Sequence, residues 1–513
     1  MPAATAVDER NRVYINMNSV AYIPSMVTPM SNKNQFFTTV PEPLYEQFRC
    51  TGESNIEYVD EHATMRCVKP NRENVQISLD KCDKAGKYPD DAVQRYADDL
   101  VYKYFSDIWD GAQPKRSDET YKFNTTASPG RMWKKRKHKD KASASQDPLF
   151  REYCEKIDHL AWYDYNPKIE LLDQDLIMVD KKIRGTFNPQ LDLLFKQKYL
   201  YDNQDAKVKD KHRTGWIKYG ISKEYGGFNE LGQKLSKCCF VSEDDCKGYD
   251  RVAWLRKWYS MRNQNMTLTP AELLLAAYVT YLVVNGYVLC PDGVLRQRPT
   301  GNCSGNNSTT CDNSGLHVSI QFRLVCNLYL FKYKRLPTLG EILESCTVNI
   351  YSDDNTTGYY EVLDMDLEDF YRIKVETYAL FGMELKPKAR VLTRVQNGRI
   401  SSDHSFLGSY FHFDEVSNHY IPLPRIEKIC SSLKYQVDSK GLVETTVKAY
   451  ALTVLSAVIP ELADECARFL NFCLRQCSLR KIDVKMCIGA DNYYAIKELS
   501  DNPRIFLHRY TGR

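Results

Sequence analysis

The chain has 513 residues, of which 43% are hydrophobic and 27% charged, which fits a globular protein of roughly two to four compact units. Its formal net charge of +4 is too close to neutral to identify a nucleic-acid partner. The 17 cysteines include no CxxC pair and follow no regular framework, which excludes zinc-finger motifs and a disulfide scaffold and favours a reducing cytosol.

In the first 235 residues, polar and charged residues interrupt the apolar segments, and few long periodic segments occur. The start Met1-Pro2-Ala3-Ala4 has no apolar core of a signal peptide. A basic stretch runs from Arg131 to Lys141, and we interpret it as a solvated loop in preference to a direct nucleic-acid contact, because lysine-rich runs are commonly exposed.

The most apolar run of the chain extends from residue 271 to residue 284 and is preceded by Thr269-Pro270. Thr269 and Glu272 form a capping-box pattern, with proline at the first helical position. The run is shorter than the about 20 residues that a bilayer crossing needs. We therefore predict a buried helix and no membrane anchor.

The middle of the chain shows strand and turn signals. Residues 239–241 form a short apolar strand that leads into a group of carboxylates. Residues 287–290 and 294–297 flank Pro291-Asp292-Gly293, which predicts a hairpin. Residues 348–351 predict another strand, which ends at Ser352-Asp353-Asp354, and residues 355–358 predict a turn after it.

Helices are predicted in two regions. One contains Leu316, Ile320, Leu324 and Leu328 at four-residue spacing. The other is the C-terminal part from about residue 421, which looks largely helical, with a long segment over 444–477 that breaks near Pro460.

Three groups of polar residues together suggest nucleotidyl transfer. They are Asp245-x4-Asp250 after a strand, the segment with Ser304, Gly305, Thr309 and Asn313, and the pair Asp353-Asp354 at a turn. Such chemistry uses two Mg2+ ions about 3.5–4 Å apart, and magnesium prefers carboxylate oxygen. Each group alone is common in solvated loops, so only their combination is informative.

The ends of adjacent strands can bring Asp245 and Asp353 together. Asp250 would then lie just past the metal site, where it could accept a hydrogen bond from a ribose 2′-hydroxyl. Thr309 and Asn313 share one helix face because four residues separate them, so both could point at the same sugar.

These groups resemble motifs A, B and C of positive-strand RNA virus RNA-dependent RNA polymerases, in the usual order. Asp180 to Phe187 also resembles the basic motif F of that family, and Phe406-Leu407-Gly408-Ser409 resembles motif E. Within this picornavirus-like superfamily the segments 182–192 and 291–313 are most similar to the astrovirus and potyvirus lineage. The likeness covers about 180 to 410, and the first 160 residues match nothing in it.

The resemblance implies a role for each matching position. Asp245, Asp353 and Asp354 would be the catalytic metal ligands for two Mg2+ ions, for which Mn2+ can substitute. The remaining implied roles are ribose recognition by Asp250, Ser304, Thr309 and Asn313, triphosphate binding by Lys181, Lys182 and Arg184, loop flexibility at Gly305, and the primer side of the site at Phe406, Leu407 and Gly408. Alternatively, the basic residues at 181–184 are simply a pair of charges on the surface with no role in binding.

Two positions depart from the family pattern. Ser352 stands where a glycine usually precedes the Asp pair, which could shift metal preference. In motif D a gapless alignment puts Arg390 where a lysine would protonate the leaving pyrophosphate, and arginine is a poor acid. Lys386 and Lys388 both remain candidates for this general acid.

The expected fold class is α+β, a right-hand polymerase with fingers, a palm made of a small antiparallel sheet backed by helices, and a helical thumb. The expected divisions are fingers with an N-terminal extension over 1–236, palm with motif A over 237–258, a fingers insertion over 259–298, palm with motifs B to E over 299–412, and thumb over 413–513.

The function implied is replication and transcription of a viral RNA genome from NTPs by a soluble chain in the host cytoplasm, at viral replication complexes. Partners would be template and product RNA, other viral replication proteins and, in one of the open initiation modes, a genome-linked protein primer. Two alternatives remain. A reverse transcriptase would need bulk in place of the Asp250 carboxylate, and a non-catalytic RNA-binding protein on a polymerase scaffold would be expected to lose Asp245, Asp353 and Asp354.

Overall fold

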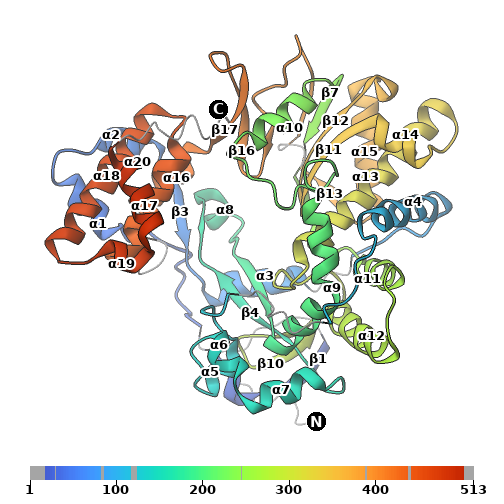
Figure 1. The fold of residues 1–513 in the computed structure, drawn as a ribbon, viewed down its shortest axis with the longest axis horizontal. Coiled ribbons are helices and arrows are strands. Elements are labelled where there is room, and N and C mark those ends of the chain that lie inside the picture. Colours follow the sequence, from blue (N-terminus) through green and yellow to red (C-terminus); the bar gives the residue numbers. More distant parts are fainter. Residues whose placement is uncertain are drawn as a thin grey trace.

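The computed structural model describes residues 18–28, 30–82, 86–116, 124–243, 245–386, 390–436 and 441–501. These residues form a mixed fold of helices and sheets, in which three groups of elements lie around the short helix α8 (Gln174–Met178) (Figure 1). None of the described helices combines the length and the apolar character that a membrane crossing requires.

The first group is built on an antiparallel sheet of four strands in the order β11-β12-β7-β14. The strands are β7 (Phe240–Glu243), β11 (Cys346–Tyr351), β12 (Asp354–Tyr359) and β14 (Val391–Arg394). Helices that belong to this group are α4 (Ala92–Ile108), α10 (Gly227–Leu235), α13 (Thr309–Tyr333), α14 (Leu339–Ser345) and α15 (Leu367–Leu380). Two small sheets adjoin it, one of β8 (Cys246–Lys247) with β13 (Glu384–Leu385), the other of β15 (Ser405–Phe406), β16 (Ser409–Asp414) and β17 (His419–Pro424).

The second group contains a five-stranded sheet in the order β1-β10-β9-β4-β6. Its strands are β1 (Asn18–Tyr22), β4 (Tyr163–Lys168), β6 (Arg184–Pro189), β9 (Tyr287–Leu289) and β10 (Val294–Gln297). Strands from the first 200 residues thus pair with strands that follow β7 in the chain. The helices of this group are α3 (Arg72–Cys82), α5 (Arg131–Lys135), α6 (Lys141–Ser145), α7 (Pro148–Glu155), α9 (Leu191–Asp210), α11 (Leu255–Gln264) and α12 (Pro270–Asn285).

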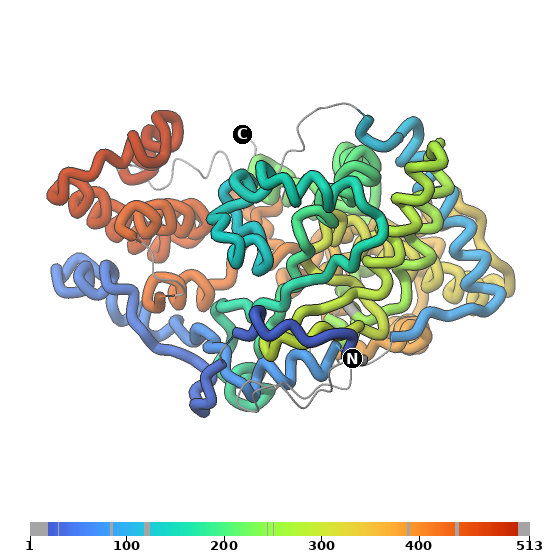
Figure 2. Tube along the Cα trace, turned by 90° about the horizontal axis from the view of Figure 1, so that it is seen from below, coloured from blue at the N-terminus to red at the C-terminus, as the bar shows by residue number. Residues whose placement is uncertain are grey.

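The third group combines elements from residues 37–68 and 171–173 with the C-terminal helices. The helices are α16 (Ile426–Lys434), α17 (Leu442–Ser456), α18 (Pro460–Leu479), α19 (Val484–Ile488) and α20 (Ala490–Asp501). Beside them lie α1 (Pro43–Arg49) and α2 (Ile56–His62), and the small sheet of β2 (Phe37–Thr38), β3 (Met65–Val68) and β5 (Leu171–Asp173) (Figures 1 and 2).

A hydrophobic core shared by α1, β3 and the C-terminal helices holds this third group together. Tyr45, Phe48 and Phe469 are fully buried in it, with ring centroids 5.1–5.8 Å apart. The hydroxyl of Tyr45 donates to Glu465 at 2.6 Å, and Ser54 donates to the same carboxylate oxygen at 2.6 Å. The N-terminal helices are therefore an integral part of the C-terminal helical unit.

Most of the predicted elements are confirmed. The capping box of Thr269 and Glu272 begins α12, the turn at 291–293 connects β9 and β10, and Pro460 begins α18 after α17 ends at Ser456. The 271–284 run forms a helix as predicted, but the prediction that this helix is buried is wrong. It forms α12, which packs one side on α9 and α11 and leaves Leu273, Leu274 and Tyr281 58%, 60% and 53% exposed.

Candidate active site

The tip of the β11–β12 hairpin carries the Asp pair. Tyr351 pairs with Asp354, so Ser352 and Asp353 form the turn between the two strands. Ser352 has φ +61°, a left-handed conformation that glycine adopts without cost and other residues rarely adopt. The serine is held there because its N–H donates to Ser314 Oγ at 2.9 Å. The turn leaves the side chain of Asp353 exposed at the end of the sheet.

Asp354 and Asp245 lie at the same end of adjacent strands. In the antiparallel pairing of β12 with β7, Thr356 is opposite Glu243, so the start of β12 at Asp354 and the end of β7 lie at the same end of the sheet. Asp245 follows two residues after the end of β7. Asp354 Oδ2 accepts a hydrogen bond from the Leu407 N–H at 2.6 Å. Burial, together with the negative charges of Glu243 and Asp353, raises the pKa of Asp354 to about 7, while the Leu407 bond opposes the shift.

Asp245 forms an ion pair with Lys386, and its carbonyl accepts from the Lys386 N–H at 3.0 Å. Of the two general-acid candidates, Lys386 is thus beside the carboxylates, whereas Lys388 lies outside the described residues. Arg390, the residue of the gapless alignment, instead donates to Glu368 at 2.9 Å and lies over the Tyr371 ring.

The start of α13 contacts the hairpin tip through Asn313. Its Nδ2 donates to Ser352 Oγ at 3.2 Å, and its Oδ1 accepts from Asn302 Nδ2 at 3.0 Å. Thr309 donates its hydroxyl to the carbonyls of Cys303 and Asn306 within the preceding loop, at 3.1 and 2.9 Å. The structure therefore brings Asn313 to the Asp pair, while the Thr309 proton stabilises the loop.

The loop before α13 packs tightly on β6. Ser304 Oγ accepts from the Phe187 N–H at 3.2 Å. A Cβ atom added to Gly305 would lie 2.2 Å from the Phe187 carbonyl oxygen and 3.0 Å from Asn188 Cα. The absence of a side chain at Gly305 is thus required by close backbone packing, a reason different from the flexibility that the sequence suggested.

The three basic residues of 181–184 separate. Lys181 forms an ion pair with Glu73, 5.3 Å above the Phe36 ring. Arg184 Nε is 2.8 Å from Glu170 Oε1. Burial lowers the pKa of Lys182, and the charges of Lys386 and Arg184 lower it further, while Asp245 opposes the shift. Lys182 is therefore the member of this group whose pKa is shifted by the charges of Asp245 and Lys386.

Of the residues expected on the primer side, Phe406 ends β15, and Leu407 and Gly408 form the turn to β16. Leu407 and Gly408 have φ +52° and +69°. Phe406 is fully buried beside Phe411, and Lys223 Nζ donates to the Leu407 carbonyl at 3.2 Å. The Leu407 N–H bond to Asp354 links this turn directly to the hairpin.

Sequence reasoning missed two buried residues that connect the three motifs. The Tyr249 hydroxyl contacts the carbonyls of Asn313 and Ser352, the second at 3.2 Å. His317 Nδ1 is 3.3 Å from the same Ser352 carbonyl, and its Nε2 is 3.2 Å from Tyr378 Oη. Tyr249 lies inside the Asp245-x4-Asp250 spacing, and His317 lies one helical turn after Asn313, so position within the motifs was the available signal.

His317 gives a prediction for stability against pH. Burial lowers its pKa to about 3, whereas an unfolded histidine titrates near 6.5. The unfolded chain therefore binds an additional proton below pH 6.5, and this residue reduces the free energy of unfolding by up to about 1.4 kcal/mol per pH unit there. We expect the free energy of unfolding of His317→Gln to decrease less steeply between pH 7 and 5 than that of the wild type. Urea titrations between pH 7 and 5 measure this, and equal slopes would contradict it.

Asp250 lies in the short 3-10 turn Tyr249–Arg251 that follows β8. The preceding residue, Tyr249, contacts the carbonyls of both Asn313 and Ser352.

The donor chemistry at this end of the sheet suits magnesium. Carboxylate oxygens from adjacent strands are the ligands that Mg2+ prefers, and waters complete its octahedron. Within the described ranges, however, no three Asp, Glu, His or Cys side chains converge closely enough to form a ready-made metal cage. Asp245, Asp353 and Asp354 therefore do not form a preformed cluster.

Comparison with known proteins gives a consistent result. The family model described as viral RNA-dependent RNA polymerase matches residues 110–474. The chain is 28% identical over 243 residues to the non-structural polyprotein 1AB of Ovine astrovirus 1, covering 45% of this chain and 17% of that protein. It is 29% identical over 154 residues to the corresponding polyprotein of Turkey astrovirus 2, covering 29% and 9%.

A plant virus protein is similar as well. The genome polyprotein of Brome streak virus is 26% identical over 184 residues, covering 31% of this chain and 19% of that protein. The chain thus spans less than a fifth of the length of each of these relatives.

Proposed function

Because this chain belongs to the viral RNA-dependent RNA polymerase family, we propose that it replicates and transcribes a viral RNA genome by nucleotidyl transfer from NTPs. The observation that carries the proposal is the meeting of three motifs at one sheet end. Asp245 follows β7, whose neighbouring strand β12 begins at Asp354, and Asn313 donates to Ser352, the neighbour of Asp353. A polymerase site needs carboxylates and a sugar-binding amide this close together.

In the proposed mechanism, Asp245 and Asp353, with Asp354 close by, hold two Mg2+ ions, for which Mn2+ can substitute. When bound, the ions activate the primer 3′-hydroxyl and stabilise the leaving pyrophosphate. Lys182 and Arg184 bind the triphosphate through charge-assisted hydrogen bonds. Lys386, beside Asp245, is the described candidate for donating a proton from Nζ to the pyrophosphate, with Lys388 as the alternative.

Sugar recognition is assigned to Asp250 and Asn313, with Ser304 and Thr309 shaping the loop between them. Asn313 already holds defined contacts to Asn302 and Ser352. The Asn313 amide can therefore switch its hydrogen bonds from these partners to a ribose hydroxyl without a large movement of α13. Lys181, which pairs with Glu73, would reach the triphosphate only after leaving that carboxylate.

We also propose the right-hand arrangement for the fold. The four-stranded sheet would be the palm, over 237–258 and 299–412. The pairing of β9 and β10 with β4 and β1 supports an insertion at 259–298 that returns to the fingers of 1–236. The helices after residue 413 would be the thumb, and α1 and α2 pack against them.

RNA template and product, NTPs and other viral replication proteins are the proposed partners, with a genome-linked protein primer as one mode of initiation. The proposed location is a replication complex in the host cytoplasm. The family match gives no support to the reverse transcriptase or to the non-catalytic RNA-binding alternative.

Primer extension by the purified chain on a short RNA primer-template, with Mg2+ and either NTPs or dNTPs, tests the proposed function. We expect products from NTPs. Preferential use of dNTPs would instead indicate a reverse transcriptase. RNA binding without extension under either condition would favour the non-catalytic alternative.

Asp250→Ala tests the sugar-reading assignment. We expect the variant's preference for NTPs over dNTPs to fall at least about tenfold. Without a hydrogen-bond partner for the 2′-hydroxyl, the site no longer discriminates against substrates that lack this group. The measurement is the ratio of kcat/KM for the two substrates. An unchanged ratio would assign sugar recognition to other residues.

A further inference from the structure

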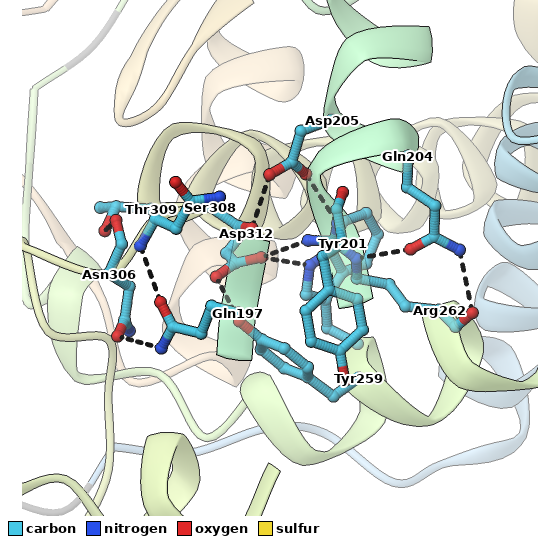
Figure 3. A network of polar contacts seen from close by, with 12 residues as sticks. Gln197, Tyr201, Gln204, Asp205, Tyr259, Arg262, Asn306, Ser308, Thr309 and Asp312 are labelled. Atoms are coloured by element: carbon cyan, nitrogen blue, oxygen red, sulfur yellow. Dashed lines mark hydrogen bonds and ion pairs between the residues drawn. The ribbon is translucent and has the colours of Figure 1, made fainter. Parts of the chain in front are cut away.

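A buried polar network connects α9 and α11 with the start of α13 (Figure 3). Its centre is Arg262 of α11, which is fully buried. The guanidinium donates four hydrogen bonds, to Gln204 at 2.9 Å, the Tyr201 carbonyl at 3.1 Å, Asp205 at 2.6 Å and Asp312 at 3.1 Å. One arginine thus ties two segments of the fingers to the helix that carries Asn313.

Asp312 lies immediately before Asn313 and is also fully buried. In addition to Arg262, its carboxylate accepts from Trp258 Nε1 at 2.7 Å and from the Tyr259 hydroxyl at 3.1 Å. Burial raises the pKa of Asp312 to about 7, and Arg262 opposes the shift. Three donors from one helix, α11, therefore fix the orientation of the first turn of α13.

Asp205 fixes the residue just before the helix. Its Oδ2 accepts from the hydroxyl of Ser308 at 2.6 Å, and its Oδ1 accepts from Arg262. Arg262 thus donates to both carboxylates of the network. Asp312 is itself part of the first turn of α13, and Asp205 accepts from Ser308 just before it. Both ends of the first turn of α13 are therefore connected through Arg262.

A second line of hydrogen bonds continues from α9 to the hairpin tip. Gln197 donates to Asn306 Oδ1 at 3.0 Å, and its Oε1 accepts from the Asn307 N–H at 2.8 Å. Asn306 Nδ2 donates to Asn302 at 2.7 Å, Asn302 donates to Asn313 at 3.0 Å, and Asn313 donates to Ser352 at 3.2 Å. An unbroken path of side chains therefore links the fingers helix α9 to the residue beside Asp353.

Stability alone does not account for this arrangement. Burying a guanidinium and two carboxylates is expensive, and well-packed apolar side chains of similar volume often serve an interface equally well. Here the bonds converge on residues 302–313, the segment that holds the sugar-recognition residues. Hydrogen bonds have defined directions, so they fix a rotation and a register that apolar contacts would leave loose.

We propose that Arg262, acting through Asp312 and Asp205, is a positioning residue that holds residues 302–313 in the one orientation in which Asn313 recognises the ribose 2′-hydroxyl. This inference rests on the proposed polymerase function. Arg262 and Asp312 are fully buried and bond to protein groups, so they act on the sugar only through the segment that they hold.

The test uses Asp312→Asn, which keeps the side-chain shape but removes the charge that faces Arg262. Ser308→Ala, which removes only the bond to Asp205, is the milder second variant. The control is Asp192→Asn, because Asp192 is a fully buried carboxylate of the same helix α9 that pairs with His159 and Lys196.

Two quantities are measured for each variant. The first is kcat/KM for NTPs and for 2′-deoxy substrates. For Asp312→Asn we expect the NTP value to fall about tenfold and the deoxy value to stay within about twofold, because only the NTP uses the 2′-hydroxyl contact. Ser308→Ala should lower the ratio of kcat/KM for NTPs to kcat/KM for 2′-deoxy substrates by a smaller factor than Asp312→Asn does. Asp192→Asn should leave this ratio unchanged. Equal losses for both substrates would overturn the proposal.

The second quantity is amide hydrogen exchange, which needs no activity. Asp312→Asn should accelerate exchange within residues 302–313 and leave the β11–β12 hairpin strands unchanged. Unchanged exchange in 302–313, or an increase spread over α9, α11 and α13, would overturn the positioning role. If the wild type extends no primer, the proposed function fails, while the exchange result still decides whether this network orders the segment.

Discussion

Asp353→Ala is expected to reduce primer extension by at least about a thousandfold while the affinity for primer-template RNA stays within about twofold. A metal ion contributes several kcal/mol to stabilising the transition state, and each about 1.4 kcal/mol is a factor of ten in rate. Asp353 is exposed at the hairpin tip, so replacing its side chain removes a ligand without opening the core.

The matched control is Asp369→Ala, which removes an exposed carboxylate from the first turn of α15, where it pairs with Arg372. This variant should extend primers like the wild type. Extension assays and filter binding with the same RNA measure both properties. Full-length product from Asp353→Ala would refute its assignment as a metal ligand.

Gly305→Ala is expected to lower activity by more than about a hundredfold, because a misplacement of about 1 Å at a reacting centre can cost that much. The added Cβ would lie 2.2 Å from the Phe187 carbonyl oxygen. Both atoms near it belong to backbone, so the loop or β6 must shift. The strain should also cost about 1–3 kcal/mol of unfolding free energy.

Gly340→Ala is the control for this variant. Gly340 lies within α14, and an added Cβ would meet nothing within 4 Å. Alanine is a better helix former than glycine, so this variant should gain up to about 1 kcal/mol in stability and keep its activity. Thermal unfolding and primer extension compare the two. Wild-type activity in Gly305→Ala would show that the loop tolerates displacement from β6.

Elements with a strong local pattern were predictable from the sequence. Strand β11 followed from a short apolar run before the Asp pair, and α13 followed from leucine and isoleucine at four-residue spacing. Residues 355–358, which the sequence suggested as a turn, instead lie in β12. The pairing of β7, which precedes Asp245, with β12, which begins at Asp354, agrees with the expectation that both carboxylates follow strand ends of one sheet. These features depend on residues close together in the chain or on the simple geometry of strand pairing.

Features made by distant contacts were not predictable. Helix α9 buries Asp192, Gln197, Gln204 and Asp205 in polar networks, so the apolar stripe that identifies most helices is weak there. The ion pair of Asp245 with Lys386 and the contact of Gly305 with β6 each require the full fold. The exposed side of α12 also contradicted a prediction made from hydrophobicity alone.

The shared core of α1 and the C-terminal helices also constrains how the chain folds during synthesis. Tyr45 reaches its partner Glu465 only after 420 further residues have been made. Contacts of such sequence separation form late, because loop closure precedes any gain from packing. The apolar faces of Tyr45 and Phe48 therefore lack their native partners throughout translation of the middle of the chain. Slow completion of this unit, and a need for chaperone protection of its N-terminal half, are the consequences for production of the protein in any host.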